Sequence, residues 1–149
     1  MKNVQIAPVI KIDQPKHIKV INALAELAMS VQNIRSSRFA ASIVYQNEVV
    51  SIGTNRMKSS PLQAKYSRNG ESIFLHAEID AIGKAKKELS YDEFEKSTLY
   101  ICRVKYIEPH KLSWQFGLAK PCLGCCKAIK DFGIKTVMYT TDENGIEYL

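Results

Sequence analysis

The sequence predicts an α/β fold, a three-layer α/β/α sandwich with a mixed central sheet. Strand-like and helix-like stretches alternate along the second half, which is typical of a sheet covered by helices on both faces. Two earlier β-rich stretches are separated by a short turn and predict an antiparallel hairpin. With 149 residues, 46% of them hydrophobic, the chain is long enough for a single domain, 1–149, with its own core.

The first half combines one helix, the hairpin and a polar segment. Apolar side chains at helical spacing predict a helix with one buried face over 17–32. The hairpin strands are expected at 38–46 and 48–53, because both stretches are rich in β-branched residues. A proline and a terminal Asn-Gly pair predict a loop over 54–70.

The second half alternates helices with strands. The expected elements are a helix at 76–89, a strand at 97–106, an irregular connection at 107–121, a helix at 122–132 and strands at 135–140 and 145–149. The two longer strands are linked through a helix, so we expect them to be parallel. The acidic stretch 88–97 is predicted to be a solvated connection without a function.

The charge of the chain is uneven. Residues 1–70 hold 10 basic and 3 acidic residues, a net of +7, whereas residues 71–149 hold 11 basic and 12 acidic residues, a net of −1. A basic half either attracts phosphates or forms a solvated surface that aids solubility. No apolar run is long enough to span a membrane, and the first fifteen residues lack the features of a secretory signal. We therefore expect a cytoplasmic protein that does not associate with membranes.

The cysteines indicate a metal site. Three of the four lie within five residues, which is unlike a disulfide framework. Cys122 and Cys125 are three residues apart, so their sulfurs project from nearly the same side of the predicted helix. Both follow Pro121 at the start of that helix, where the helix dipole favours the thiolate form that a metal requires. Zinc is the natural partner of two thiolates and an imidazole.

A histidine also opens a predicted helix. If the two helix N-termini converge at one edge of the sheet, His76, Cys122 and Cys125 meet at one point. Three protein ligands would leave the fourth tetrahedral position of one zinc ion to water, which is the arrangement of a catalytic site. Glu78 would then be an unligated carboxylate beside that water.

Two simpler interpretations compete with a catalytic site. Cys122 and Cys125 could form a redox pair or half of a structural zinc site. The fourth ligand of a structural site would come from Cys126, Cys102, His110 or His17. However, Cys126 lies about 100° round the helix from Cys125. Cys102 lies in an apolar strand and is expected in the core, and both histidines are expected on the surface.

The sequences "HAE" and "PCLGC" together resemble the signature of the zinc-dependent cytidine and deoxycytidylate deaminase superfamily. The resemblance covers about residues 18–140 and implies a cytidine deaminase-like fold. It also implies that His76, Cys122 and Cys125 bind one zinc ion and that Glu78 shuttles protons in the hydrolytic deamination of cytosine. In such enzymes an asparagine that follows a strand and a glycine contacts the substrate, which nominates Asn55.

Three hypotheses for function follow. The first is a zinc-dependent hydrolase of a free cytosine nucleotide or nucleoside, of the dCMP type, with Arg56 and Lys58 near a substrate phosphate. The second is a deaminase of cytosine or adenine in single-stranded DNA or RNA. The basic half of the chain favours it, as would stacking of Trp114 and Phe116 on bases instead of packing in the domain. The third is a zinc fold without activity, which the presence of Glu78 disfavours. The resemblance also implies a homo-oligomer.

Overall fold

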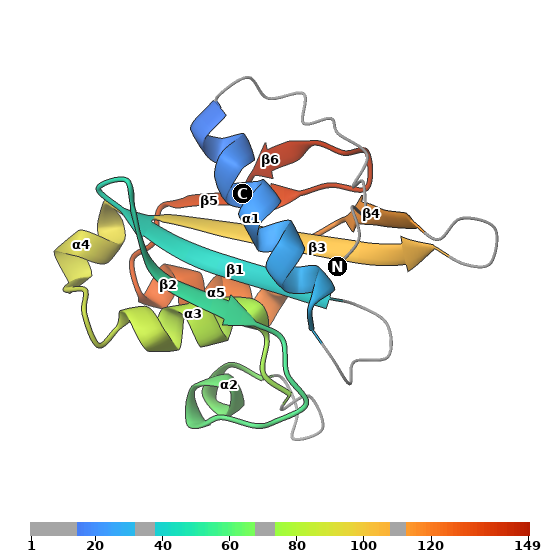
Figure 1. Ribbon diagram of the computed structural model, residues 1–149. Coiled ribbons are helices and arrows are strands. Elements are labelled where there is room, and N and C mark those ends of the chain that lie inside the picture. The colour runs from blue at the N-terminus through green and yellow to red at the C-terminus, as the bar shows by residue number, and fades with distance from the viewer. Residues whose placement is uncertain (1–14, 32–37, 68–73, 108–112) are drawn as a thin grey trace.

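The computed structural model describes residues 15–31, 38–67, 74–107 and 113–149 (Figure 1). Its elements in chain order are α1 (Pro15–Met29), β1 (Arg38–Tyr45), β2 (Glu48–Thr54), α2 (Pro61–Tyr66), α3 (Ala77–Ala85), α4 (Tyr91–Glu95), β3 (Thr98–Ile107), β4 (Ser113–Gly117), α5 (Leu123–Asp131), β5 (Thr136–Thr140) and β6 (Ile146–Tyr148). None of the helices in these ranges has the length and apolar character needed to cross a bilayer.

The strands form one mixed sheet, as predicted. Its order is β2-β1-β3-β5-β6, and β4 also pairs with β3. β3 and β5 are parallel, whereas the other pairs are antiparallel. Arg103 and Val104 of β3 pair with both β1 and β4, so β4 must lie on the same side of β3 as β5.

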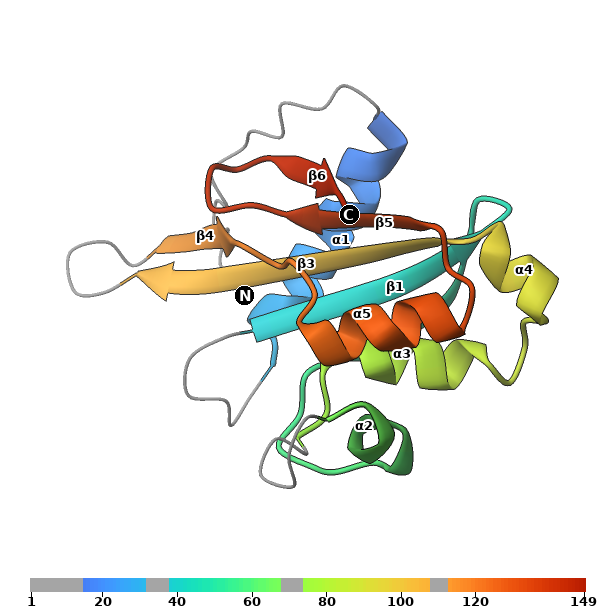
Figure 2. The ribbon, with the colours of Figure 1, turned by 180° about the vertical axis from the view of Figure 1, so that it is seen from behind.

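Helices cover both faces of this sheet, which confirms the three-layer prediction. α1 crosses one face, and α3 and α5 pack on the other (Figures 1 and 2). Alternate residues of β3 pack against the two helical layers, because successive side chains of a strand point to opposite faces of the sheet. Leu99 and Ile101 pack in the cluster that contains α3 and α5, whereas Tyr100 and Cys102 pack against α1.

The expectation that His17 is a surface residue was wrong. His17 is 8% exposed and lies on the buried face of α1. Its Nδ1 is 2.5 Å from the hydroxyl of Tyr100 in β3. Burial lowers the pKa of the His17 imidazole, with a smaller contribution from the positive charge of Lys16. The ring is therefore a neutral hydrogen-bonding partner in the α1 layer.

The predicted loop 54–70 contains a short helix. Ser60 caps α2, because its Oγ accepts a hydrogen bond from the backbone N–H of Gln63 at 3.0 Å. Pro61 follows at the first helical position, where its missing N–H costs nothing. The proline that indicated a loop is thus part of a helix start.

The predicted irregular connection 107–121 contains a strand, β4. Trp114 pairs with Tyr106 across the ladder, and Phe116 pairs with Val104. Phe116 is 2% exposed and Trp114 packs against the α1-side cluster. Both aromatic side chains therefore pack within the domain, which was the alternative to stacking on nucleic-acid bases.

The acidic stretch 88–97 contains α4 and is not only a connection. Ser90 and Glu93 form a capping box, in which each side chain accepts a hydrogen bond from the other residue's backbone N–H. Phe94 is 3% exposed and anchors this helix in the core. The acidic residues stabilise a helix start, where the dipole favours negative charge.

Close packing fixes where α3 begins. A Cβ atom at Gly53 of β2 would lie 2.4 Å from the carbonyl oxygen of Ala77, so only glycine allows this approach. One turn further on, Asp80 Oδ2 accepts a hydrogen bond from the backbone N–H of Thr54 at 3.2 Å. The first turn of α3 is thereby held against the end of β2.

Candidate metal centre and active site

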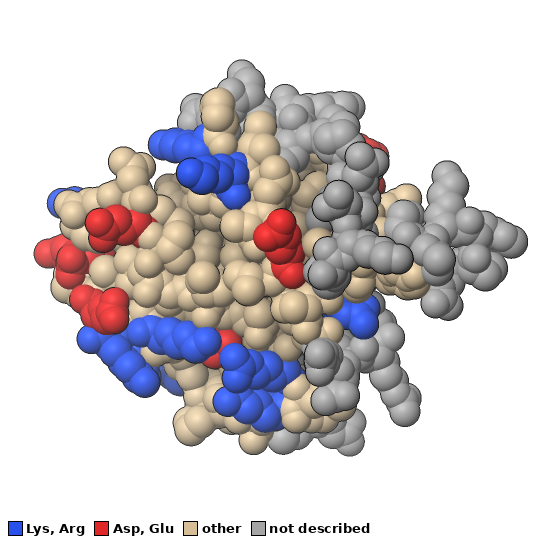
Figure 3. All heavy atoms as spheres, viewed as in Figure 1, with Lys and Arg blue, Asp and Glu red and all other residues tan. Residues whose placement is uncertain are grey.

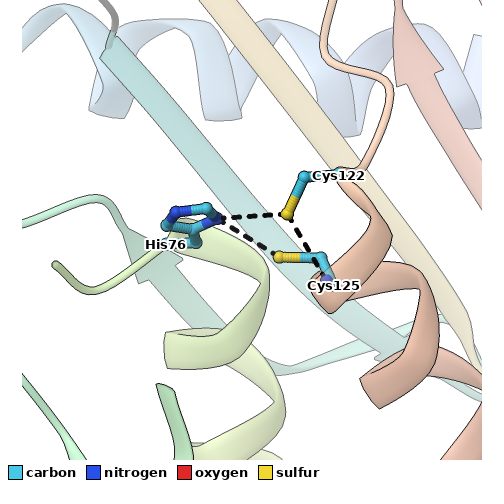
Figure 4. Close-up of side chains that lie close together, drawn as sticks. All are labelled: His76, Cys122 and Cys125. Atoms are coloured by element: carbon cyan, nitrogen blue, oxygen red, sulfur yellow. Dashed lines mark hydrogen bonds between the residues drawn. The ribbon is translucent and has the colours of Figure 1, made fainter. Parts of the chain in front are cut away.

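His76 is the N-cap residue of α3, one position before the helix that it was expected to open. Its backbone is extended (φ −84°, ψ 151°), and its side chain makes no capping hydrogen bond. The imidazole instead points away from its own helix and toward α5 (Figure 4). The local structure therefore leaves a ring nitrogen available to a ligand.

Cys122 and Cys125 lie at the start of α5. Cys122 was expected in the first turn of the helix, but it is the N-cap residue, one position before the first turn. Pro121 precedes this cap. The sulfur of Cys122 accepts a hydrogen bond from the backbone N–H of Cys125 at 3.5 Å. This contact and the dipole of α5 both stabilise a thiolate at position 122.

The three side chains converge, as predicted (Figure 4). Nδ1 of His76 lies 3.3 Å from Sγ of Cys125 and 3.7 Å from Sγ of Cys122. Tetrahedral zinc with ordinary bond lengths would place a nitrogen and a sulfur ligand about 3.6 Å apart. The ligand atoms of all three lie within 4.8 Å of one another, and no fourth histidine, cysteine or carboxylate of the described ranges joins them. The donor set and its spacing therefore fit one zinc ion that retains an open position.

The electrostatics of the group favour a thiolate at Cys122. Contacts with Cys125 and His76 lower the pKa of the Cys122 thiol to about 3. The contact with Cys122, together with burial, raises the pKa of the Cys125 thiol. The contact with Cys122 also raises the pKa of His76. The two sulfurs thus hold one negative charge in a half-buried position, where a cation is favoured.

Glu78 lies on the first turn of α3, two residues after His76. It is 5% exposed, and burial raises the pKa of its carboxyl group. Its side chain lines a cavity of about 290 Å³ that His76 and Cys122 also line. A carboxyl group beside the metal position that faces a cavity can exchange protons with a bound molecule.

Two of the three residues predicted to bind substrate line this cavity. They are Asn55 and Arg56, which follow β2. Oδ1 of Asn55 accepts a hydrogen bond from the backbone N–H of Phe39 at 2.9 Å, so this side chain also ties β1 to the cavity wall. Lys58 lines a neighbouring hollow of about 380 Å³, and not the cavity that contains Glu78.

Four other cavity residues were not predicted from the sequence. Lys120 adds a second cation to the cavity lining that contains Arg56, and Phe39, Met57 and Phe74 supply apolar surface. Phe74 and Met57 are 48% and 56% exposed, so they lie at the mouth. Lys120 directly precedes the Pro-Cys motif, and this position is the one signal that could have indicated it.

Gln63 of α2 was also missed. It is 3% exposed, and its Oε1 accepts a hydrogen bond from the backbone N–H of His76 at 2.9 Å. The N-cap backbone of α3 is therefore held by a side chain from another helix. The pattern Ser60-x-x-Gln63 is that of a capping box and could have revealed the helix, but not this partner.

None of the remaining cysteines and histidines that the structure describes completes a structural site. Cys126 directs its sulfur to the carbonyl oxygen of Pro121 at 3.5 Å, and Cys102 is fully buried in the α1 layer, as expected. His17 contacts Tyr100 on the α1 face. His110 lies outside the described residues, as does the rest of segment 108–112.

Comparisons with known proteins agree with the geometry. The family model of the cytidine and deoxycytidylate deaminase zinc-binding region matches residues 14–141. A crystal structure of dCMP deaminase from the cyanophage S-TIM5 in complex with dCMP and dUMP is similar, with 21% identity over 87% of this chain and 85% of that chain, and a TM-score of 0.55. The apo form of that enzyme gives 19% identity over 87% and 86%, with a TM-score of 0.51. No curated protein sequence matches significantly.

The fold and the site define the class of protein, a zinc-dependent hydrolase with a cytidine deaminase-like fold. Because the family model covers most of the sequence, the chain belongs to the cytidine and deoxycytidylate deaminase family. Family members are zinc-binding deaminases, and the group His76, Cys122 and Cys125 is positioned to bind such an ion.

The two adjacent cysteines offer a matched test of zinc binding. We expect Cys125→Ser to lower the zinc content of the purified protein well below one ion per chain, because an alcohol replaces a thiolate ligand. Cys126→Ser should leave it near one, because that sulfur bonds the Pro121 carbonyl and is not part of the metal-binding group. Elemental analysis of both variants measures this, and equal zinc contents would contradict the assignment.

Gln63 offers a test of how the histidine is held. Gln63→Ala should lower zinc affinity about tenfold or more, as the loss of an outer partner of a metal ligand commonly does. It should also lower the free energy of unfolding by about 1–3 kcal/mol, because the buried N–H of His76 loses its acceptor. Gln63→Glu keeps an acceptor oxygen and should recover much of both. Competition with a chromogenic chelator and urea unfolding measure the two effects.

Proposed function

We propose that this enzyme hydrolyses the exocyclic amino group of cytosine in dCMP or a closely related nucleotide, releasing ammonia. The observation that carries the proposal is the placement of a buried carboxyl group, Glu78, in the same cavity as the metal-binding group. A purely structural zinc site has no need of a buried carboxylate that faces a cavity.

The proposed chemistry divides between the ion and Glu78. Zinc, when held by His76, Cys122 and Cys125, makes a water molecule nucleophilic by lowering its pKa from about 15.7 to about 7. Glu78 accepts the proton that this water releases as its oxygen attacks C4 of cytosine. Glu78 gives this proton to the ring nitrogen N3, then takes the remaining proton from the new C4 hydroxyl group and gives it to the departing amino group. The C4–N bond breaks, ammonia leaves, and the base becomes uracil.

The cavity mouth supports a nucleotide as substrate. Arg56 and Lys120 both line the cavity and are exposed, so their charges can meet a phosphate that stays near the solvent. The exposed apolar side chains of Phe74 and Met57 lie at the same mouth and can cover a sugar or a base. The similar cyanophage enzyme was crystallised with dCMP and dUMP, which agrees with this substrate class.

A polynucleotide substrate is the alternative, and the basic first half of the chain favours it. Trp114 and Phe116 do not support it, because both pack within the domain. We further propose that residues 1–149 form one deaminase domain and that the enzyme acts in the cytoplasm on soluble nucleotides. Reducing conditions there keep the ligand cysteines as thiols. The resemblance to deaminases also favours a homo-oligomer.

Replacing Glu78 separates catalysis from metal binding. We expect Glu78→Gln to retain zinc and to lower kcat about 10²- to 10⁴-fold, because it removes the general acid and base. Ammonia release from dCMP measures turnover, and elemental analysis measures zinc. The exposed Glu88→Gln serves as the control and should match the unmodified enzyme. A Glu78→Gln variant with near-native turnover would contradict this role.

A substrate panel tests the nucleotide assignment. Arg56→Gln and Lys120→Gln should each raise the KM for dCMP about tenfold, because a charge-assisted contact to phosphate is lost. The KM for deoxycytidine should change little. Lys58→Gln is a comparison outside the cavity and should have a smaller effect. Conversion of single-stranded oligonucleotides with a steep dependence on salt, and no conversion of dCMP, would favour the alternative.

A further inference from the structure

A second hollow lies on the opposite face of the sheet from the metal-binding group. This groove has a volume of about 620 Å³ and lies between α1 and the β1–β2 hairpin; we call it the α1 groove. Two rows of side chains across β2, β1 and β3 contribute its floor. The strand pairing places Ser42 between Ile52 and Tyr100 in one row, and Val44 between Val49 and Thr98 in the next.

The floor of the α1 groove contains a hydroxyl group without a partner. Ser42 is 1% exposed, and its Oγ makes no hydrogen bond to any described residue. An unsatisfied buried hydroxyl lowers stability, so native proteins rarely keep one without a reason. The neighbouring polar pair, His17 and Tyr100, satisfy each other. Ser42 lines the groove, so a molecule bound there could supply the missing partner.

The walls of the groove are cationic. Lys16 and Lys19 lie on α1, and Lys96 is the C-cap residue of α4, two residues before β3. No carboxylate appears among the described lining residues, and none of the three lysines forms an ion pair with a described carboxylate. The face that carries the groove is seen in Figure 3, where basic side chains and separate acidic side chains both border an uncharged surface. An anion would complement this arrangement.

The groove also exposes apolar surface. Leu27 of α1 is 36% exposed, and Val49 and Ile52 of β2 are 53% and 39% exposed. All three side chains line the same groove, which gives it an apolar wall. A ligand that fits must therefore combine an apolar part with a negative charge.

We propose that the α1 groove binds one small amphipathic anion, a phosphate or carboxylate carried on an apolar body. The volume lies within the range of about 300–1,000 Å³ that is common for small-molecule sites. Its lining matches such sites, with mostly apolar walls and a few polar groups that fix orientation. The sheet separates the groove from the metal-binding group, since α1 packs on one face and α3 and α5 pack on the other. The groove is thus a site distinct from that of the deaminase reaction.

Octyl phosphate, below the concentration at which it forms micelles, serves as the probe. Added to the zinc-loaded protein labelled with ¹⁵N, it should shift the amide resonances of Ser42, Val44 and Leu24 in a saturable manner. Inorganic phosphate tests the charge alone and 1-octanol tests the apolar part alone. We expect each to bind at least about tenfold more weakly, because each makes only part of the contacts.

Variants with matched charge test the lysines. Replacing Lys16, Lys19 and Lys96 together by glutamine should weaken binding of octyl phosphate about tenfold. Replacing Lys86, Lys87 and Lys130 by glutamine removes the same charge from exposed positions on α5 and around the end of α3, and should change nothing. Both triple variants should deaminate dCMP at the unmodified rate.

Two single variants test the shape of the groove and its hydroxyl group. Ala23→Trp places a bulky side chain in the groove from an exposed helix position and should abolish binding. Ser42→Ala should weaken binding about three- to tenfold without lowering the melting temperature, because the hydroxyl has no partner within the described protein. A hydroxyl kept only for packing would leave the affinity unchanged.

Several results would overturn the proposal. These are the absence of shifts in the groove, shifts confined to the cavity of Glu78, or equal binding of 1-octanol. Line broadening that grows with protein concentration and blocks the probe would mean that a second copy occupies the groove. Sedimentation with phosphatidylglycerol vesicles, without binding of octyl phosphate, would mean that a membrane surface is the ligand. If the unmodified protein bound octyl phosphate in the α1 groove but did not deaminate dCMP, only the proposed function would be contradicted.

Discussion

The structure of the site depends on the meeting of two helix N-termini at one edge of the sheet. α3 presents His76 and α5 presents Cys122, each as the N-cap residue of its helix. A helix N-terminus carries partial positive charge and free N–H groups, which stabilise a thiolate but would repel a lone cation. The negative charge shared by the two sulfurs reverses this preference. A metal is therefore favoured only because both sulfurs and the imidazole are held within a few ångströms of one another.

Small residues and one amide side chain hold this meeting point in place. Gly53 lets α3 approach β2, and a Cβ atom at Gly124 would lie 2.2 Å from the carbonyl oxygen of Tyr66 at the end of α2. Gln63 joins α2 to the backbone of His76. α2 therefore contacts the starts of both ligand-bearing helices without supplying a ligand. Such supporting contacts position the three ligand side chains, because the ligands alone do not hold their own backbones in place.

The ligand motifs and most elements could be predicted because their signals are local. Spacing alone brought Cys122 and Cys125 to one side of a helix. Contacts between distant segments leave no such signal, which is why Gln63 and Lys120 were missed. His17 is different, because the buried α1 positions Ile21, Leu24 and Ala28 continue backward to it at intervals of four, three and four residues. The helical periodicity therefore predicts that His17 is buried. This signal was missed because an isolated histidine was assumed to be exposed.

The two hollows share one strand, and this decides whether they can influence each other. β1 begins beside the cavity, where Phe39 lines the wall and donates its N–H to Asn55. Three residues further on, Ser42 forms part of the floor of the α1 groove. Coupling between the sites would require β1 to move, yet it is paired with β2 on one side and β3 on the other. A ligand can shift catalysis only through a conformation that it prefers. Hydrogen bonds along both edges oppose such a movement, so a ligand in the groove should leave deamination unchanged.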